Sequence, residues 1–424
     1  MKSNPPVDTD VGHLVDHLFR QHAGRMLSTL TRLLGSRHLA LAEEVVQEAL
    51  ITALQQWPFR GVPDNPSAWL VHVAKNRALD RLRRDRTFAE KERDVAAALE
   101  SRIAHVDPGR PFEDDELCMM FMACHPEIPR ESRVALTLKT VGGFSVPEIA
   151  QAFLAQEATI AQRLVRVKRF MRERDIPLDL PAASEMPARL ESVLEVLYLM
   201  FNEGYAAHSG DSLVRQDLVH EAIRLTRLLT QDPATARPGT HALLALMLLQ
   251  AARIPARADE RGDLFVLEEQ DRAAWSREMI ADGLRHLDAS ARGNDVTAYH
   301  LQAGIAATHA VAPTYAETNW SEIVSLYDAL VDLEPSPVVA LNRAIALSRV
   351  EGPGAGLRAL DALRDDPTLS RYALFHAALG ELSRETGDLA AAEAHYRAAL
   401  ALRCSDPGRR FLERKLGTIR SAGA

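Results

Sequence analysis

Two short stretches of the sequence concentrate cations at helical spacing, and the chemistry open to them is contact with phosphate. The first runs from Lys75 to Arg86 and the second from Arg163 to Arg174, and each contains six cations. Apolar residues recur on the other side of each helical period, so each stretch is predicted to bury one face and expose the other. Rows of Lys and Arg bind phosphates, while a few neighbouring side chains read bases. A solvated basic face explains either helix alone, but the pair favours DNA binding at two places.

Catalytic and metal chemistry have little support in the same sequence. Cys118, Cys124 and His125 form the spacing C-x5-C-H, which fits no standard zinc pattern and lacks an obvious fourth ligand. No P-loop, GxGxxG, HExxH or GxSxG motif occurs. We therefore expect no enzyme activity, no cofactor and no metal site. The cysteines, with Cys404 as the third, cannot form a disulfide framework and fit a reducing compartment.

Composition predicts an all-α protein with differently charged halves. The chain has 424 residues, a net charge of -8 and 47% hydrophobic residues, with few runs of β-branched residues in period-two alternation. Residues 1–178 hold 25 Lys and Arg against 24 Asp and Glu, a net charge of +1, whereas residues 179–424 hold 25 against 34, a net charge of -9. No apolar run suits a signal peptide or a membrane span, so we expect a cytoplasmic protein without membrane contact.

The first basic stretch follows two predicted amphipathic helices. They span His13–Leu34 and Leu41–Trp57, and Pro58 is expected to stop the second. Phe59–Ser67 has the composition of a loop, and Ser67 is a candidate cap for the basic helix that follows. Thr87–Pro111 then reads as a linker.

The second basic stretch closes a helix-turn-helix pattern. Acidic residues at 114–116 favour a helix start, and Glu131–Thr140 is predicted as a helix that ends at a Gly pair. Ser145 and Glu148 make a capping box for a short helix. A turn at Phe153–Gln156 leads into a basic helix at Glu157–Arg174, although the turn lacks the usual glycine.

The rear half is predicted to be helical throughout and to end in repeats. Pro177–Pro187 reads as a linker, and helices follow from Ala188. Leu379, Gly380, Gly387, Ala392, Tyr396 and Ala399 have tetratricopeptide spacing. About three degenerate repeats are expected between Ala303 and Leu402, while residues 188–300 cannot be assigned to a repeat register.

Three blocks in the front half resemble the two-domain core of an extracytoplasmic-function sigma factor of the sigma-70 family. They are AEEVVQEALITALQQW, SAWLVHVAKNRALDRLRR and VPEIAQAFL…ATIAQRLVRVKR, in the order of that family. The blocks YLMFNEGYAAHSG (Tyr198–Gly210) and LEEQDRAAW (Leu267–Trp275) are similar to a subgroup with a long C-terminal tetratricopeptide-like extension. The resemblance implies sigma region 2 at 10–86 and region 4 at 112–176. Linkers at 87–111 and 177–187 would then join them to the extension at 188–424.

The same resemblance implies an RNA polymerase sigma factor and assigns roles to particular residues. Its partners would be promoter DNA and core RNA polymerase, through the β′ coiled coil and the β subunit. Three sets of residues correspond to the family's binding positions. Polymerase docking falls on Glu43, Glu44, Gln47 and Glu48; recognition of the minus-ten element on Phe59, Asn65, Trp69, Asn76, Arg77, Asp80, Arg81 and Arg84; and recognition of the minus-thirty-five element on Thr159, Gln162, Arg163, Arg166, Lys168 and Arg169.

Purely structural interpretations of these residues, and two rival functions of the chain, stay open beside these roles. The acidic residues of the docking set also suit a solvated face, and Trp69 suits a core position better than a platform for a base. One rival is a helix-turn-helix regulator with a tetratricopeptide sensor, and the other is a repeat scaffold whose basic front holds nucleic acid. Neither needs the Phe59–Asn65 loop. We also expect an intramolecular contact through which the extension regulates the front domains, while its direction, its ligand and the oligomeric state stay open.

Overall fold

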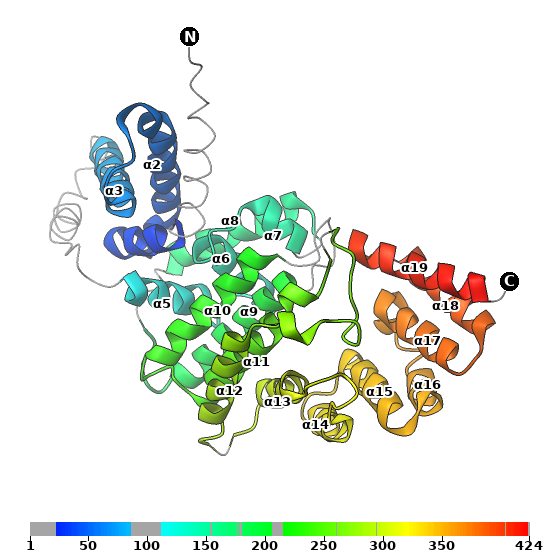
Figure 1. The fold of residues 1–424 in the computed structure, drawn as a ribbon. Helices are drawn as coiled ribbons and strands as arrows, with labels where there is room; N and C mark the ends of the chain where they lie inside the picture. The colour runs from blue at the N-terminus through cyan, green and yellow to red at the C-terminus, as the bar shows by residue number, and fades with distance from the viewer. Residues whose placement is uncertain are drawn as a thin grey trace, which may run out of the picture. The chain divides into compact units, whose positions relative to one another are not determined.

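The chain folds into helices in both halves, as its composition predicts. The computed structural model describes residues 23–422 except 86–111, 153–154, 175, 177, 179, 206–214, 260, 294 and 403. The described part is all-α, and its β structure is one isolated bridge between Ala258 and Leu264. It divides into two compact units, Met1–Val196 and Leu197–Ala424, and each is described by itself. Figure 1 shows the order of the helices.

The first described part of the front unit consists of helical segments. A helix over residues 23–34 is followed by η1 (Ser36–His38), α2 (Leu39–Arg60) and α3 (Pro66–Asp85). On α3, Leu70, Ala74 and Ala78 recur every four residues and are fully buried. This stripe lies against α2, so the basic stretch does pack one face, as its period predicts.

Two predicted element boundaries in this region are wrong. Pro58 does not stop α2, because a proline in the last turn removes only one hydrogen bond of a helix that is about to end. The helix ends at Gly61, whose φ of 80° is accessible to glycine at little cost. The cap of α3 is Asn65 and not Ser67, since the Asn65 Oδ1 accepts a hydrogen bond from the Ala68 amide at 3.0 Å.

The second half of the front unit is a four-helix block that contains the predicted helix-turn-helix. Its helices are α5 (Phe112–Ala123), α6 (Arg130–Thr140), α7 (Val146–Ala152) and α8 (Glu157–Arg174). The capping box before α7 is confirmed. The Ser145 amide donates to the Glu148 carboxylate at 2.7 Å, and the Glu148 amide donates to the Ser145 hydroxyl at 3.3 Å. The basic helix has its predicted bounds, while Phe153 in the predicted turn lies outside the described residues.

Two buried carboxylates on α5 join this block to the helix over residues 23–34. Asp115 is 3% exposed and lies 2.5 Å from the Arg32 Nε, and it also accepts a hydrogen bond from the Thr29 hydroxyl at 2.9 Å. Glu116 is 1% exposed and lies 3.4 Å from the Arg25 Nε. Breaking one side of a buried ion pair leaves an uncompensated charge. These contacts therefore hold the two halves of the front unit together.

The division between the two units falls inside α9 (Met186–Tyr205), later than the predicted linker at 177–187. Residues in the first turns of α9 pack within the front unit. The Arg189 guanidinium donates to the Phe121 carbonyl, and Arg133 donates to the Ser192 hydroxyl at 2.9 Å. By packing, the rear unit therefore begins about ten residues after the position expected from composition.

The rear unit begins with helices arranged around α11. The elements are α10 (Gln216–Gln231), α11 (Pro238–Ala251), the short turns η4 (Ile254–Ala256) and η5 (Arg272–Ala274), α12 (Arg277–Ser290) and α13 (Ala298–Val311). Nearly every residue from Ala242 to Leu249 is completely buried, because α11 packs against α10, α12 and α13. A helix that is apolar on all sides is typical of such a central position.

The rest of the rear unit is a series of helix pairs, as the repeat pattern predicts. It comprises α14 (Trp320–Leu333), α15 (Pro337–Glu351), α16 (Pro353–Asp361), η6 (Leu369–Arg371), α17 (Ala373–Glu385), α18 (Leu389–Ala401) and α19 (Asp406–Ala422). At Gly380 an added Cβ would lie 3.2 Å from the Tyr396 ring, which is itself 1% exposed. The small residue therefore lets α17 and α18 approach closely, as the tetratricopeptide spacing requires.

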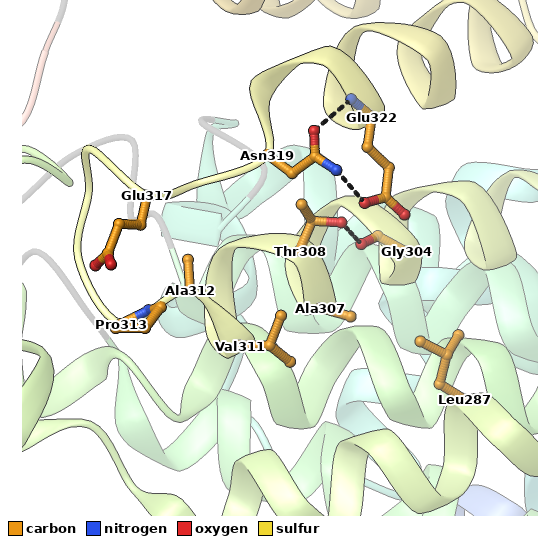
Figure 2. A pocket seen from close by; sticks show the side chains of 10 residues that line it. All are labelled: Leu287, Gly304, Ala307, Thr308, Val311, Ala312, Pro313, Glu317, Asn319 and Glu322. Carbon is orange, nitrogen blue, oxygen red and sulfur yellow. Dashed lines mark hydrogen bonds between the residues drawn. The ribbon is translucent and has the colours of Figure 1, made fainter.

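A cavity of about 490 Å³ lies between α13 and α14 of the rear unit. Its wall combines apolar side chains such as Val311 with two carboxylates, Glu317 and Glu322 (Figure 2). Asn319 caps α14 at its edge by accepting from the Glu322 amide at 3.2 Å and donating to the Glu322 carboxylate at 3.1 Å. Both acids are thus engaged locally, by Asn319 and by the Thr314 hydroxyl.

Candidate nucleic-acid interface

The last turn of α2 carries an exposed aromatic side chain, Phe59, which is 88% exposed. The Trp57 and Trp69 rings lie 5.5 Å apart at 59°, and Trp57 is buried while Trp69 is half-buried. Asn65 is occupied in capping α3. Trp69 thus packs against Trp57 between the two helices, and the Phe59 ring is open to solvent.

The exposed face of α3 brings cations against acids of α2. The Arg81 guanidinium lies 3.0 Å from Glu44 and 2.6 Å from Glu48, while Arg77 lies 3.5 Å from Glu48. The hydrogen bond with Glu48, together with the charge of Glu44, raises the pKa of Arg81. Two groups of residues that the sequence assigns to different partners, polymerase and DNA, are thus adjacent and paired.

The other polar residues assigned to α3 differ in their surroundings. Asn76 is exposed, and its amide nitrogen lies 3.0 Å from the His72 Nε2. Asp80 is exposed as well. The backbone of Arg84 belongs to α3, but its side chain lies outside the described residues.

The remaining docking residues lie on the same α2 surface. Gln47 is exposed, whereas Glu43 is only 14% exposed because it forms an ion pair with Lys168 of α8. Lys168 is one of the residues assigned to the minus-thirty-five element. Lys139 lies near this pair, and burial lowers its pKa against the opposing charge of Glu43. The front unit therefore pairs an acid that the sequence assigns to polymerase docking with a cation that it assigns to DNA, across its two halves.

The outer face of α8 presents the residues expected to read bases. Thr159, Gln162, Arg163 and Arg166 line a cavity of about 430 Å³. Its other wall is formed by residues 127–129 of the α5–α6 turn and by Ser132 of α6. Arg163 reaches across it to Glu131, with an Nη2–Oε2 distance of 2.7 Å. Within the described part of the chain, Arg166 has no carboxylate partner. Arg169 is 63% exposed and lies 4.0 Å from Glu173.

One exposed residue of α8 was missed because sequence reasoning searched for polar side chains. Val165 is 65% exposed although Leu164 and Val167 beside it are buried. An apolar side chain on an outward helix face is suited to contact with a thymine methyl group. The sequence does indicate that Val165 is exposed, since position 165 falls outside the helical period of the buried residues Ile160, Leu164, Val167 and Met171.

The cysteine and histidine region is part of the core of the α5–α6 block. Cys124 is fully buried, and its sulfur lies 3.6 Å from the Thr137 hydroxyl. Burial raises the pKa of the Cys124 thiol to about 11, which disfavours the thiolate that a metal would need. Burial lowers the pKa of His125, and the positive charge of Arg189 lowers it further.

None of the described helices is both long and apolar enough to span a bilayer.

Models of known protein families match three successive parts of the chain. The model for sigma-70 region 2 matches residues 18–88, and the model for sigma-70 region 4 matches residues 118–171. A third model, described as a family of unknown function named DUF6596, matches residues 189–291. The first two contain the α2–α3 pair and the helix-turn-helix respectively, and the third covers the start of the rear half.

Individual relatives extend this similarity over most of the chain. The uncharacterized protein R00370 of Rhizobium meliloti (strain 1021) is 42% identical over 370 residues, which cover 86% of this chain and 87% of that protein. The probable ECF RNA polymerase sigma factor SigI of Mycobacterium tuberculosis (strain ATCC 25618 / H37Rv) is 28% identical over 41% of this chain and 58% of its own length. The ECF RNA polymerase sigma factor SigM of the same strain is 27% identical over 36% of this chain and 72% of its own length.

Proposed function

Because the chain belongs with protein R00370 to the extended ECF group of the sigma-70 family and is an RNA polymerase sigma factor, we propose which of its surfaces carry each step of initiation. The α2 surface around Glu44, Gln47 and Glu48 docks on the β′ coiled coil of core polymerase. The Phe59–Asn65 loop and α3 engage the minus-ten element, and α8 engages the minus-thirty-five element, with the β subunit nearby. The protein acts in the cytoplasm, where polymerase and promoter meet.

The observation that carries this proposal is the pair of cation-rich helices, each with its opposite face buried and each in its own helical block. Neither needs a catalytic group, because initiation by a sigma factor requires binding and strand separation. On α8, Gln162 has an amide suited to adenine, and Arg163 and Arg166 have guanidinium groups suited to guanine. Lys168 and Arg169 lie further along the helix and supply phosphate contacts, which add affinity without reading sequence.

The loop after α2 suits the capture of an unstacked base. Extruding a base costs a few kcal/mol, and a pocket that binds only the extruded base shifts the equilibrium by its differential affinity. Phe59 supplies an exposed ring for stacking, and the Trp57–Trp69 pair packs α2 against α3 beside the loop. Asn65 holds the start of α3 in register beneath the loop. The geometry accounts for a fixed platform with one exposed aromatic group.

The ion pairs of the front unit must exchange partners during this process. Glu43 contacts Lys168, and Glu44 and Glu48 contact Arg81. Each pair joins a group proposed to bind polymerase to a group proposed to bind DNA. Docking on a basic polymerase surface would free the cations for phosphate, so polymerase binding and DNA binding are expected to favour each other.

The rear half is proposed to control the activity of the front half in cis. Its net charge of -9 complements the basic helices, and a repeat array suits the binding of another chain segment. A covalent connection keeps the effective concentration on the order of millimolar, so even a weak interaction is populated. A chain that ends at Val196, the last residue of the front unit, should then differ from the full chain in transcription, whereas equal activity of this folded truncation contradicts control in either direction.

A fork-junction DNA probe with an unpaired minus-ten element tests the assignment of the loop. Phe59→Ala should weaken binding of the polymerase complex to this probe by about 5- to 150-fold, the range expected for loss of one stacked base. Leu374→Ala, a substitution of a rear-unit apolar residue that is 61% exposed, is the control and should leave binding unchanged. Equal binding by the Phe59 variant would remove the loop from the proposal.

A further inference from the structure

The two sequence blocks of the rear half that have no role in promoter binding converge on one cluster of arginines. Tyr205 belongs to the first block, Tyr198–Gly210, and Gln270, Arg272 and Trp275 belong to the second, Leu267–Trp275. The Arg253 and Arg272 guanidinium carbons lie 5.4 and 4.6 Å from the centre of the Trp275 ring. The Arg257 guanidinium carbon lies 3.9 Å from the centre of the Tyr205 ring. All three arginines are partly buried.

Two of these arginines have a structural explanation. Arg272 donates to the carbonyls of His309 and Ala312 at 2.5 and 2.8 Å, which closes the C-terminus of α13. Arg257 donates to the Tyr205 carbonyl and closes the C-terminus of α9. The carbonyl end of a helix carries a partial negative charge of about half an electron, so each cap neutralises part of one guanidinium.

Arg253 has no comparable partner. Its Nε and Nη2 both point to the Gln270 Oε1 at 3.4 Å, beyond the usual range of a strong hydrogen bond. Among the described residues it forms no ion pair, and two carboxylates of the segment that follows it are engaged elsewhere. Asp263 pairs with Arg410 at 2.5 Å, and Asp271 caps η5 by accepting from the Ala273 amide. Within the described part of the chain, the Arg253 guanidinium is therefore left without a carboxylate.

A second, independent observation shows an unused donor in the same cluster. Trp275 is 3% exposed, and its indole Nε1 is buried without a hydrogen-bond partner in the described part of the chain. A buried polar hydrogen without a partner costs free energy comparable to a lost hydrogen bond. The Nδ1 of His309 is likewise unpartnered. Burial lowers the pKa of His309 to about 3, assisted by the charges of Arg253 and Arg272, so its ring is neutral at physiological pH.

We propose that Arg253 and the indole N–H of Trp275 bind a small organic carboxylate, and that this site makes the rear unit a sensor of an anionic metabolite. The two protein groups are donors only, so the contacting ligand atoms must be acceptors. A carboxylate offers two acceptor oxygens in the plane that a guanidinium prefers, and the second lone pair of one oxygen can accept from the indole. Its single charge matches that of Arg253, the one arginine of the three that caps no helix. The proposal involves the rear unit alone and does not depend on the roles assigned to the front unit.

Acetate is the probe for a direct test on the full chain, with sodium chloride replaced by sodium acetate at constant ionic strength. Acetate has four heavy atoms, so we expect dissociation constants on the order of millimolar. The indole Nε1–H resonance of Trp275, identified by its loss in Trp275→Phe, should shift saturably with acetate. The melting temperature of the chain should rise over the same concentrations. A resonance that stays in place up to saturating acetate overturns the proposal.

Variants separate this site from general salt effects. In Arg253→Met the rise in melting temperature should disappear. In Arg261→Met, a change of an exposed arginine between Ala258 and Leu264, the rise should remain. Trp275→Phe should raise the acetate concentration at half-effect about tenfold, as expected for one hydrogen bond to a charged group. An equal rise in wild type and Arg253→Met means an ionic effect and contradicts the proposal. Inorganic phosphate that binds more tightly than acetate at the same ionic strength contradicts the choice of a carboxylate. If Arg253→Met fails to fold, Arg253→Lys replaces it, and the Trp275 resonance of wild type still decides.

Discussion

The inter-helix ion pairs of the front unit and the arginine cluster around Trp275 in the rear unit differ in the groups that contact their positive charges. In the front unit, cations of one helix meet carboxylates of another, as in Arg32 with Asp115, Arg81 with Glu48 and Lys168 with Glu43. In the rear unit, the arginines around Trp275 meet carbonyl groups and aromatic rings. Internal ion pairs can exchange for pairs with polymerase and DNA, whereas a cation without a carboxylate needs a ligand from outside. We propose that the front-unit surface exchanges its internal ion pairs for contacts with polymerase and DNA, whereas the arginine cluster around Trp275 binds a ligand from outside the chain.

The largest expected effect comes from breaking the buried pair that joins the two halves of the front unit. Asp115→Ala leaves the partly buried Arg32 without its partner and removes the acceptor of the Thr29 hydroxyl. We expect a loss of about 3 kcal/mol in the free energy of unfolding. Urea unfolding measures it, and Glu191→Ala, at an exposed acid of the same unit, is the control and should cost less than about 0.5 kcal/mol. A loss that small in Asp115→Ala would show that the pair does not hold the halves together.

The next effect concerns promoter recognition by α8. Arg163→Ala and Arg166→Ala should each weaken binding to the minus-thirty-five element by about 1–3 kcal/mol, or roughly 5- to 150-fold, and leave polymerase association intact. Arg169→Ala is the matched control. As a phosphate contact, it should weaken all sequences alike and reduce the salt slope by about one. Loss of core polymerase from the arginine variants in a pull-down would contradict the assignment of surfaces.

Charge reversal on α2 should have the complementary result. Glu44→Arg together with Glu48→Arg should abolish polymerase docking while minus-thirty-five binding by α8 is kept. Because Glu48 also pairs with Arg81 and Arg77, melting temperature must be compared first. Glu195→Arg, at another partly exposed acid of the front unit, serves as the control for added charge. Retained docking by the folded double variant would remove this surface from the proposal.

A smaller effect is expected from Glu381, a carboxylate of the repeat region that its neighbours keep ionised. Burial alone would raise the pKa of Glu381, but hydrogen bonds from Arg384 and Tyr396, with the charge of Lys415, lower it to about 2. Because the folded pKa lies below the unfolded value near 4.5, the stabilisation is complete above pH 4.5 and is lost as the pH falls toward 2. After allowance for solvent screening we expect about 1–2 kcal/mol. Urea unfolding between pH 5 and pH 3 should be less steep in pH for Glu381→Gln, and an unchanged slope contradicts the assignment.

The smallest effect tests the exchange of ion pairs most finely. Glu43→Gln frees Lys168 from its acid while keeping the shape of the side chain. We expect a change in unfolding free energy below about 1 kcal/mol. Binding of the chain to duplex DNA should become a few-fold tighter, with a salt slope increased by about one phosphate contact. An unchanged salt slope would mean that Lys168 is already available to DNA in the wild type.

Local features of this fold can be predicted from the sequence, whereas contacts between distant segments cannot. The Ser145–Glu148 capping box, the bounds of α8 and the Gly380–Tyr396 contact each depend on residues within one helix pair. For Asp115 the sequence indicates only a helix start, because nothing local reveals that Arg32 lies beside it. Arg25 and Arg32, seven residues apart on one helix face, are the only hint of two acids opposite.

The candidate site shows the same division. Its residues can be identified from their types, but their pairing with one another cannot. Arg81 and Glu48 are 33 positions apart, and Lys168 and Glu43 are 125 apart, so no helical period connects them. Likewise, Pro58 suggests a helix stop, yet the last turn of a helix tolerates proline when the chain can end the helix just after it, here at Gly61 with its positive φ.

Transcription in vitro with purified core RNA polymerase tests the central claim most directly. The full chain should yield discrete transcripts from a promoter that it occupies in cells. Core enzyme alone should yield none, and transcript yield should fall with Phe59→Ala and with Arg163→Ala. A chain that binds this promoter as duplex DNA, yet gives no transcript with an active core enzyme, would contradict the account and identify a DNA-binding regulator instead.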